Sequence, residues 1–198
     1  MSRKEDFEGR YQSETTPWEL NRPDSHLVRI IEKEIVKPCR ALEIGCGTGS
    51  NAIWLSAGGF KVTAMDFSPL AIEKAKEKAR QEGADIKFLV KDFLLEKKAE
   101  PEFEFIFDRG CFHSFADKKD RKAFAKNASR RLKPGGVWFS ILGSTDAPPR
   151  DEGPPMRSAL DIVLACEPFF EILSLVADRF DSNREKPVRC WLCLMKKR

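Results

Sequence analysis

The sequence predicts an α/β fold: a doubly wound sheet of seven mostly parallel strands with an antiparallel edge strand and helices on both faces. Short apolar runs alternate with helical segments along most of the chain, which is typical of parallel strands that are buried on both faces. The last two apolar runs are joined by DSNREKP, which is too short for a helical crossover, so these two strands should pair antiparallel. A chain of 198 residues fits one main domain.

The first half of the chain contributes three expected strands. Residues 1–24 are polar apart from a few aromatic side chains, and they predict a loop or lid. Apolar residues at helical spacing predict a helix that begins at Ser25, is capped by Asp24 or Ser25, and is ended by Pro38. Further on, strands are expected over 40–45, 60–66 and 86–90, with helices over 50–59 and 69–83 between them.

The second half contributes four expected strands. They span 103–108, 137–143, 170–180 and 188–196, and helices are expected over 117–132 and 157–166. Pro134, Gly135 and Gly136 should stop the first of these helices. The domain organisation that follows is an N-terminal lid or arm over residues 1–24 and one main domain over residues 25–198.

Composition favours a cytoplasmic globular protein. Hydrophobic residues make up 41% and charged residues 33%, no apolar run approaches a membrane span, and the first residues lack the apolar core of a signal peptide. The six cysteines have no framework spacing and indicate free thiols, and Cys190 and Cys193 favour core packing over a zinc or redox role. The net charge of +4 favours solvated basic faces over a nucleic-acid groove.

The stretch ALEIGCGTGS places Gly45, Gly47 and Gly49 directly after the first strand. Glycine there permits positive φ and lets the backbone approach a ligand, and ligands bind outside the carboxyl ends of strands in such sheets. The second strand ends in Asp66, where an acid accepts hydrogen bonds from both hydroxyls of an adenosine ribose. Strand, glycine loop, helix, strand and terminal acid in this order predict a nucleoside site.

Two nucleotide classes are disfavoured by the residues of this loop. A dinucleotide fingerprint needs glycine where the chain has Ser50, and a P-loop needs a Gly-Lys-Ser/Thr ending, which is absent. Glu43 lies two residues before the first glycine, where a carboxylate would repel a pyrophosphate. A ligand that carries an ammonium and a sulfonium group fits the Glu43 carboxylate better than a pyrophosphate does.

These motifs resemble the class I S-adenosylmethionine-dependent methyltransferases, whose fold is Rossmann-like. LEIGCGTG is similar to their first motif, VTAMDFS to their ribose-binding second motif, VKDF to the adenine-binding stretch, and RRLKPGGVWF to the turn into their fifth strand. The resemblance covers roughly residues 38–198 and implies S-adenosyl-L-methionine as cofactor and no metal. It implies these cofactor-binding residues: Trp18, Arg22, Glu43, Gly45, Cys46, Gly47, Asp66, Phe67, Asp92, Phe93 and Asp108.

Within that set the resemblance implies distinct roles. Gly45 and Gly47 face the methionine moiety, and Glu43 orients its ammonium group. Asp66 takes the ribose beside Phe67. Asp92 takes the adenine amino group, and its neighbour Phe93 either covers the ring or belongs to the core.

The residues after the fourth strand bear on the methyl acceptor. They read FDRGCFHSFADKKDR and lack the Asn/Asp-Pro-Pro-aromatic motif of enzymes that methylate amino groups of nucleic acids. Asp108-Arg109-Gly110, SETTPWELNRPD and GSTDAPPRDEGPP resemble the thiopurine, thiol and halide methyltransferases, whose N-terminal segment folds over the cofactor and whose Gly-Pro-Pro loop borders the acceptor. Phe112-His113 departs from that group, which indicates a different acceptor pocket.

Three side chains keep two interpretations each. Trp18 covers the sulfonium region by a cation–π contact or anchors the N-terminal arm. Arg109 attracts an anionic acceptor or pairs with Asp108 or a lid carboxylate. His113 deprotonates a thiol acceptor or is structural. Arg109 and His113 are the candidate catalytic residues.

The sequence therefore predicts a methyltransferase that acts on a small soft nucleophile: a thiol, a selenium or tellurium species, or a halide. The alternatives are an O- or N-methyltransferase of a metabolite and a non-catalytic cofactor-binding protein. We expect a small-molecule acceptor, neither a membrane nor a nucleic-acid partner, and a monomer or weak homodimer.

Overall fold

The computed structural model describes residues 3–96, 102–146, 155–183 and 185–198. The chain forms two compact units, Met1–Phe93 and Leu94–Arg198, and each is described by itself. The expected division into an arm over residues 1–24 and a domain over residues 25–198 stays a prediction.

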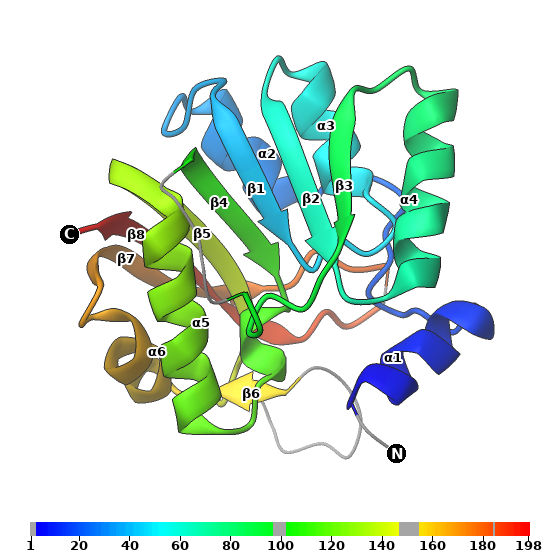
Figure 1. Cartoon of the computed structure of the whole chain (residues 1–198). Coiled ribbons are helices and arrows are strands. Elements are labelled where there is room, and N and C mark those ends of the chain that lie inside the picture. The colour runs from blue at the N-terminus through cyan, green and yellow to red at the C-terminus, as the bar shows by residue number, and fades with distance from the viewer. Residues whose placement is uncertain (1–2, 97–101, 147–154, 184) are drawn as a thin grey trace. The chain divides into compact units, whose positions relative to one another are not determined.

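The first unit contains three parallel strands in the order β3-β2-β1. They are β1 (Arg40–Ile44), β2 (Lys61–Asp66) and β3 (Ile86–Val90). The helices are α1 (Arg3–Gln12), α2 (Ser25–Glu32), α3 (Ser50–Ala57) and α4 (Pro69–Gln81). The helices α3 and α4 pack against β2 and β3, and α1 packs against α4 (Figure 1). Because the strands are parallel, their carboxyl ends meet at one edge of this unit.

Local chemistry explains the boundaries of these helices. The carboxylate of Asp24 accepts from the His26 N–H and caps α2, as expected, and Ser68 caps α4 ahead of Pro69. The α2 helix ends at Glu32, earlier than Pro38 predicts, because Glu34 adopts a positive φ of 53°. The expected loop over residues 1–24 is wrong in part, since Arg3–Gln12 is helical.

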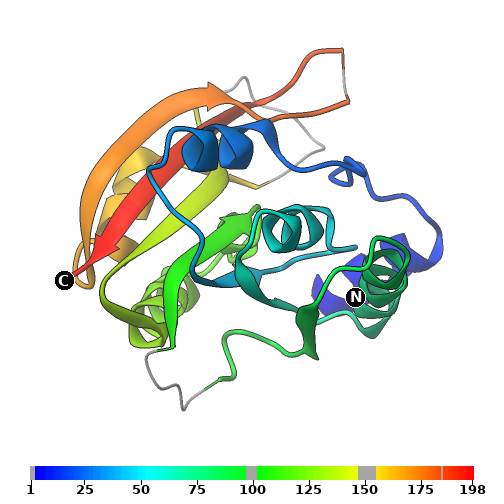
Figure 2. The same cartoon turned by 90° about the horizontal axis from the view of Figure 1, so that it is seen from above.

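The second unit contains four long strands in the order β4-β5-β8-β7. They are β4 (Phe103–Arg109), β5 (Leu132–Ser144), β7 (Phe170–Arg179) and β8 (Arg189–Lys197). The strands β4 and β5 are parallel, and β8 runs antiparallel to both β5 and β7. Figure 2 shows β5, β8 and β7 side by side as a curved sheet. The expected antiparallel pairing of the last two strands is confirmed, with β8 lying between β5 and β7.

Helices and one short strand complete this unit. The 3₁₀ helix η1 (Phe112–Ser114) follows β4, α5 (Lys118–Arg131) leads into β5, and α6 (Ala159–Cys166) precedes β7. The two-residue strand β6 (Met156–Arg157) pairs with the end of β5 and was not expected, which brings the strands in the described residues to eight. The helix α5 ends at Arg131 and Leu132 is already extended, so the expected stop residues Pro134, Gly135 and Gly136 lie inside β5.

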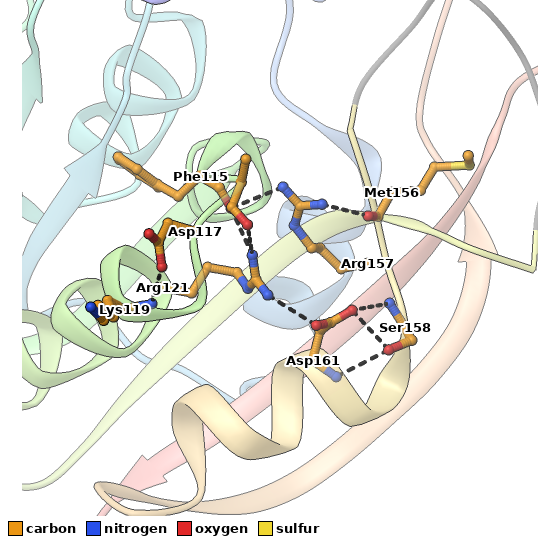
Figure 3. A network of polar contacts seen from close by, with 9 residues as sticks. Phe115, Asp117, Lys119, Arg121, Met156, Arg157, Ser158 and Asp161 are labelled. Carbon is orange, nitrogen blue, oxygen red and sulfur yellow. Dashed lines mark hydrogen bonds and ion pairs between the residues drawn. The ribbon is translucent and has the colours of Figure 1, made fainter.

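A partly buried polar network ties α5, β6 and α6 together (Figure 3). Arg121 on α5 donates to the carbonyl oxygens of Phe115 and Ala116 and to the carboxylate of Asp161 at 2.9 Å. Asp161 also forms a capping box with Ser158 at the start of α6. Arg157 shares the Phe115 carbonyl oxygen, so the segment after η1 is held from two sides.

Candidate functional site

The glycine loop after β1 uses backbone conformations that favour glycine. Gly45, Gly47 and Gly49 have φ values of 70°, 54° and 84°, and Gly49 is the left-handed N-cap of α3. A Cβ on Gly49 would come within 3.1 Å of the Ala75 Cβ, so this glycine also lets the loop pack closely against α4. The N–H groups of Gly45 and Cys46 both donate to the Met65 carbonyl oxygen, which fixes the loop against the end of β2.

Asp66 lies at the end of β2, directly against this loop. One carboxylate oxygen accepts from the Gly47 N–H at 3.0 Å, and the other accepts from the Ser68 N–H at 3.0 Å. Burial raises the pKa of the Asp66 carboxyl, while these backbone bonds counteract the rise. The structure therefore brings the predicted ribose-binding acid and the glycine loop together.

Glu43 points its carboxylate into the same neighbourhood from β1. The side chain is 2% exposed, Oε1 accepts from Asn51 Nδ2 at 3.0 Å, and Oε2 is buried with no hydrogen-bond partner. Burial raises the pKa of Glu43 to about 8, and the negative charge of Glu19 adds to the rise. A buried carboxylate oxygen without a partner is suited to a cationic ligand.

Sequence reasoning missed Asn51, which holds Glu43 in place. Its amide oxygen accepts from the Asp24 N–H at 2.8 Å while its amide nitrogen donates to Glu43. Asn51 thus connects the start of α2 to the end of β1. Its position on the first turn of α3, just after the glycines, is the only signal that the sequence offered.

Sequence reasoning also missed the role of Glu19 and Tyr11, which come from the N-terminal segment. Oxygens of Glu19 accept from the Thr48 N–H at 3.3 Å and from the Thr48 hydroxyl. Tyr11 is 4% exposed, and burial raises the pKa of its phenol. A Cβ on Gly47 would lie 3.0 Å from the Tyr11 hydroxyl oxygen. The N-terminal segment therefore reaches the glycine loop inside the first unit.

An aromatic cluster holds Trp18 on that segment. Trp18 Nε1 donates to the Tyr11 hydroxyl at 3.2 Å, and the Trp18 ring lies 5.1 Å from the Phe7 ring. The Phe7 ring in turn meets the Phe67 ring edge-on at 5.8 Å. These contacts support the anchoring interpretation of Trp18 and leave its cation–π role a prediction. Arg22 is exposed and donates to the Pro23 carbonyl oxygen.

The remaining predicted cofactor residues of this unit lie at the same strand edge. The Lys91 N–H donates to the Asp66 carbonyl oxygen, which sets the half-buried Asp92 just beyond β3. Phe93 is buried, as a core residue would be. Cys46 is buried as well, and burial raises the pKa of its thiol, so it is not a reactive thiolate.

In the second unit, Asp108 is a buried acceptor of structural hydrogen bonds. Its oxygens accept from the Phe112 N–H and from Trp138 Nε1, each at 2.9 Å. Burial raises the pKa of Asp108 to about 6, and the hydrogen bonds limit the rise. Its predicted role in cofactor binding stays a prediction.

Arg109 and His113, the candidate catalytic residues, both lie near Phe180. Arg109 donates to the Asp181 carbonyl oxygen at 2.6 Å, and its guanidinium lies 5.5 Å from the centre of the Phe180 ring. His113 is 5% exposed, and its Nδ1 accepts from the Gly143 N–H at 2.7 Å. A neutral imidazole that accepts at Nδ1 carries its proton at Nε2.

Part of the predicted acceptor loop, residues 147–154, lies outside the described residues. In the described parts of the chain, no group of three or more His, Cys, Asp and Glu side chains could hold a metal ion. The helices described here include none that is long and apolar enough to cross a membrane.

Comparisons with known proteins agree with this geometry. Residues 41–136 match the model of a methyltransferase domain. A probable thiol methyltransferase 2 of Arabidopsis thaliana is 30% identical over 151 residues, which cover 75% of this chain and 65% of the relative. The chain thus spans about two thirds of the length of that relative.

Two further proteins are similar to this chain. A 2-heptyl-1-hydroxyquinolin-4(1H)-one methyltransferase of Mycobacteroides abscessus is 27% identical over 157 residues, which cover 75% of this chain and 68% of the relative. A structure solved in work on the conversion of a disulfide bond into a thioacetal group during echinomycin biosynthesis has a TM-score of 0.86 and 26% identity. It covers 99% of this chain, and this chain covers 92% of it.

The fold, the glycine loop with its two acids, and the relatives all indicate a methyltransferase. A structural match over nearly the whole chain confirms the predicted fold class. Residues 41–136 are a methyltransferase domain, and the chain is similar to the class I S-adenosylmethionine-dependent methyltransferases and, among them, to the thiol methyltransferases.

Proposed function

We propose that this protein transfers the methyl group of S-adenosylmethionine to a small soft nucleophile, namely a thiol, a selenium or tellurium species, or a halide, by in-line displacement. The first unit fits the cofactor, because Glu43 Oε2 is buried without a partner and the glycine loop lies directly against Asp66. Glu43 and the glycine loop would hold the amino-acid end, and Asp66 the ribose. The cofactor supplies an activated methyl group on a cationic sulfur.

The protein contributes alignment and the exclusion of water. Holding two reactants in line supplies about 7–11 kcal/mol of the barrier. A soft anion needs little further help, whereas a neutral phenol or amine needs a base. Whether a residue after β4 can act as a base therefore distinguishes soft anionic acceptors from neutral phenols and amines.

The hydrogen bond from the Gly143 N–H to His113 Nδ1 is the observation that carries the soft-nucleophile proposal. The backbone N–H can only donate, so Nδ1 has no proton and Nε2 holds the one proton of the neutral ring. Accepting a second proton at Nδ1 would break this bond and set two N–H groups against each other. His113 is therefore suited to donate a hydrogen bond from Nε2 and unsuited to act as a base.

Asp108 does not replace it as a base. Its carboxylate is fully buried and already accepts from Phe112 and Trp138. An acceptor that reaches the enzyme already ionised, such as a thiolate or iodide, needs neither residue to remove a proton. This agrees with the relative named as a probable thiol methyltransferase.

Comparing iodide with thiols tests the proposal, since iodide has no proton to lose. His113→Asn keeps an acceptor for the Gly143 N–H and removes the Nε2–H donor. If His113 is a donor, kcat/KM should fall by a similar factor for iodide and for thiols. If it were the base, the thiol reaction would fall by about 10²–10⁴-fold while the iodide reaction kept its rate. No methylated product from any thiol, selenite, tellurite or iodide would overturn the proposed acceptor class.

Methylation of an oxygen or nitrogen of a metabolite is the second candidate, favoured by the relative whose name gives a 1-hydroxyquinolinone as its acceptor. Turnover of such acceptors but not of thiols would select it. Tight cofactor binding with no turnover of any acceptor would select the non-catalytic alternative.

A cytoplasmic location and a monomer or weak homodimer complete the proposal. Cys46, Cys166 and Cys193 are buried free thiols, as expected in a reducing compartment.

A further inference from the structure

Glu19 follows Trp18 on the segment between α1 and α2, and it meets the glycine loop inside the first unit. Its oxygens accept from both the backbone N–H and the hydroxyl of Thr48, which immediately follows Gly47. The Glu19 N–H donates to the Thr16 carbonyl oxygen at 2.9 Å, so a local turn aims the side chain at the loop.

The Glu19 carboxylate lies against Gly47, on the side where a side chain would stand. An ideal Cβ on Gly47 would come within 2.5 Å of Glu19 Oε1, a distance that real Cβ atoms do not show. Gly47 is also the residue whose N–H binds Asp66. Glu19 therefore borders the same short stretch of backbone that the cofactor approaches.

Three carboxylates converge at this loop, and their charges act on one another. Burial is the main cause of the raised pKa values of Glu43 and Asp66, and the negative charge of Glu19 adds to both. Among the described residues, the donors to Glu43 and Asp66 are neutral groups, including the Asn51 amide and the Gly47 N–H.

Lys78 supplies a cation near Glu19, whereas no cation is hydrogen-bonded to Glu43 or Asp66 among the described residues. Its ammonium donates to the Thr48 hydroxyl oxygen at 2.7 Å and to Asn21 Oδ1 at 2.8 Å, and the Thr48 hydroxyl donates a hydrogen bond to Glu19. The loop thus retains an excess of negative charge. Glu43 Oε2 is buried without a partner and is suited to contact a cationic ligand.

We propose that Glu19 is a residue of the cofactor site that favours the sulfonium form of the ligand over its demethylated product. S-adenosylmethionine carries one positive charge more than S-adenosylhomocysteine, because loss of the methyl group leaves a neutral thioether. Each carboxylate at the loop stabilises the extra charge, and Glu19 adds one to the two that the family motifs supply. After transfer the ligand has lost the positive charge that Glu19 stabilised, which favours release of the product. The inference rests on the cofactor and is independent of the acceptor.

Glu19→Gln removes the charge but keeps an oxygen for the Thr48 N–H. A residue that only fastens the N-terminal segment would affect both ligands equally, whereas a charge effect weakens S-adenosylmethionine selectively. We expect the substitution to raise its Kd about tenfold and to change the Kd of S-adenosylhomocysteine by about twofold or less. Isothermal titration calorimetry of both ligands measures this without turnover.

Two further variants sharpen the test. Glu14→Gln removes a charge from the same segment, where Glu14 is exposed and pairs with Lys74, and should leave both affinities unchanged. Lys78→Met removes the compensating cation and should shift the preference further toward S-adenosylmethionine. It also keeps the inference testable if Glu19→Gln fails to fold, which the melting temperature of the ligand-free variant reports.

The possible results distinguish a wrong role for Glu19 from a wrong assignment of the cofactor. Equal weakening of both ligands, or no weakening of either, in Glu19→Gln overturns the role of Glu19. An unchanged preference in Lys78→Met also counts against it. If the folded wild-type protein bound neither ligand, the cofactor assignment itself would fail.

Discussion

At the scale of single residues, Glu43 shows how burial creates a binding group. A glutamate on an exposed surface would be ionised at neutral pH, but burial raises the pKa of Glu43 to about 8. The side chain is therefore held ready to ionise when a cation arrives. The Asn51 amide fixes Oε1, and Oε2 is left for the ligand.

Binding of S-adenosylmethionine near neutral pH should consequently release protons. The ammonium group of the ligand stabilises ionised Glu43 and lowers its pKa from about 8. Calorimetry at pH 7 in buffers of different ionisation enthalpy measures the number of protons released. Glu43→Gln should release fewer, and a wild-type binding heat that did not depend on the buffer would contradict this account.

Asn51→Leu should weaken cofactor binding and destabilise the fold by about 1–3 kcal/mol, because Glu43 and the Asp24 N–H both lose their partner. Calorimetry and urea unfolding measure the two effects. Gln81→Leu is the matched control, since its amide donates to Glu77 on the exposed surface of α4. Equal effects of the two substitutions would show that Asn51 does not position Glu43 for the cofactor.

At the scale of elements, the predicted segments follow hydrophobic patterning and caps, and the misses have local causes. The pattern of α1 is too polar to predict a helix, and α1 forms where it packs against α4. The two residues of β6 are too few for any pattern, and pairing with β5 alone defines them. Sequence patterns thus miss the elements that form only through contact with another helix or strand.

One ion pair links α5 to the start of α6 in addition to their packing. Asp161 bonds Arg121, which is 4% exposed, and Arg157 lies close enough for its pKa to be lowered, first by burial and then by the charge of Arg121. Figure 3 shows Asp161 between Arg121 and the start of α6. Removing the Asp161 carboxylate leaves the guanidinium groups of Arg121 and Arg157 without a neutralising charge.

Asp161→Ala should therefore destabilise the protein by about 2–4 kcal/mol, because Arg121 is buried and loses its partner and the capping box with Ser158 is lost as well. Asp117→Ala, which removes only the exposed cap of α5, should cost about 0.5–2 kcal/mol. Urea unfolding of both variants measures the difference. A cost for Asp161→Ala no larger than that for Asp117→Ala would mean that the network is solvated and contributes little.

At the scale of the whole molecule, buried acids give the stability of the ligand-free protein an unusual pH dependence. The pKa of Glu43 is raised by folding from 4.5 to about 8, so the folded state binds the proton more tightly than the unfolded chain. Ionisation of the unfolded chain then lowers stability as the pH rises. Asp108 acts in the same direction between 3.8 and about 6.

Wild type and Glu43→Gln should accordingly have the closest free energies of unfolding below pH of about 4.5. The wild type should lose stability relative to the variant as the pH rises to about 8, and the difference should then level off. Urea unfolding at pH intervals measures it. A difference that stays constant from pH 4 to 9 would mean that Glu43 is not held protonated by burial.

The sequence by itself determined the α/β class, the glycine loop, the two acids at strand ends and the family resemblance. These features depend on short-range patterns: alternation of apolar runs, residues that tolerate positive φ, and an acid at the end of a strand. Tertiary structure decided which side chains meet there. Parallel pairing of β1, β2 and β3 brings Gly45, Asp66 and Lys91 to one edge.

Tertiary structure alone also placed Glu19 against Gly47, Asn51 against Glu43, and the Gly143 N–H against His113. Glu19 and His113 lie 29 and 30 residues from the partners to which they are hydrogen-bonded, so no sequence pattern reports these contacts. Packing sets the burial, the charge environment and the tautomer of such groups. Those properties, more than residue type, decide whether a side chain binds a cation, donates a proton or only supports the fold.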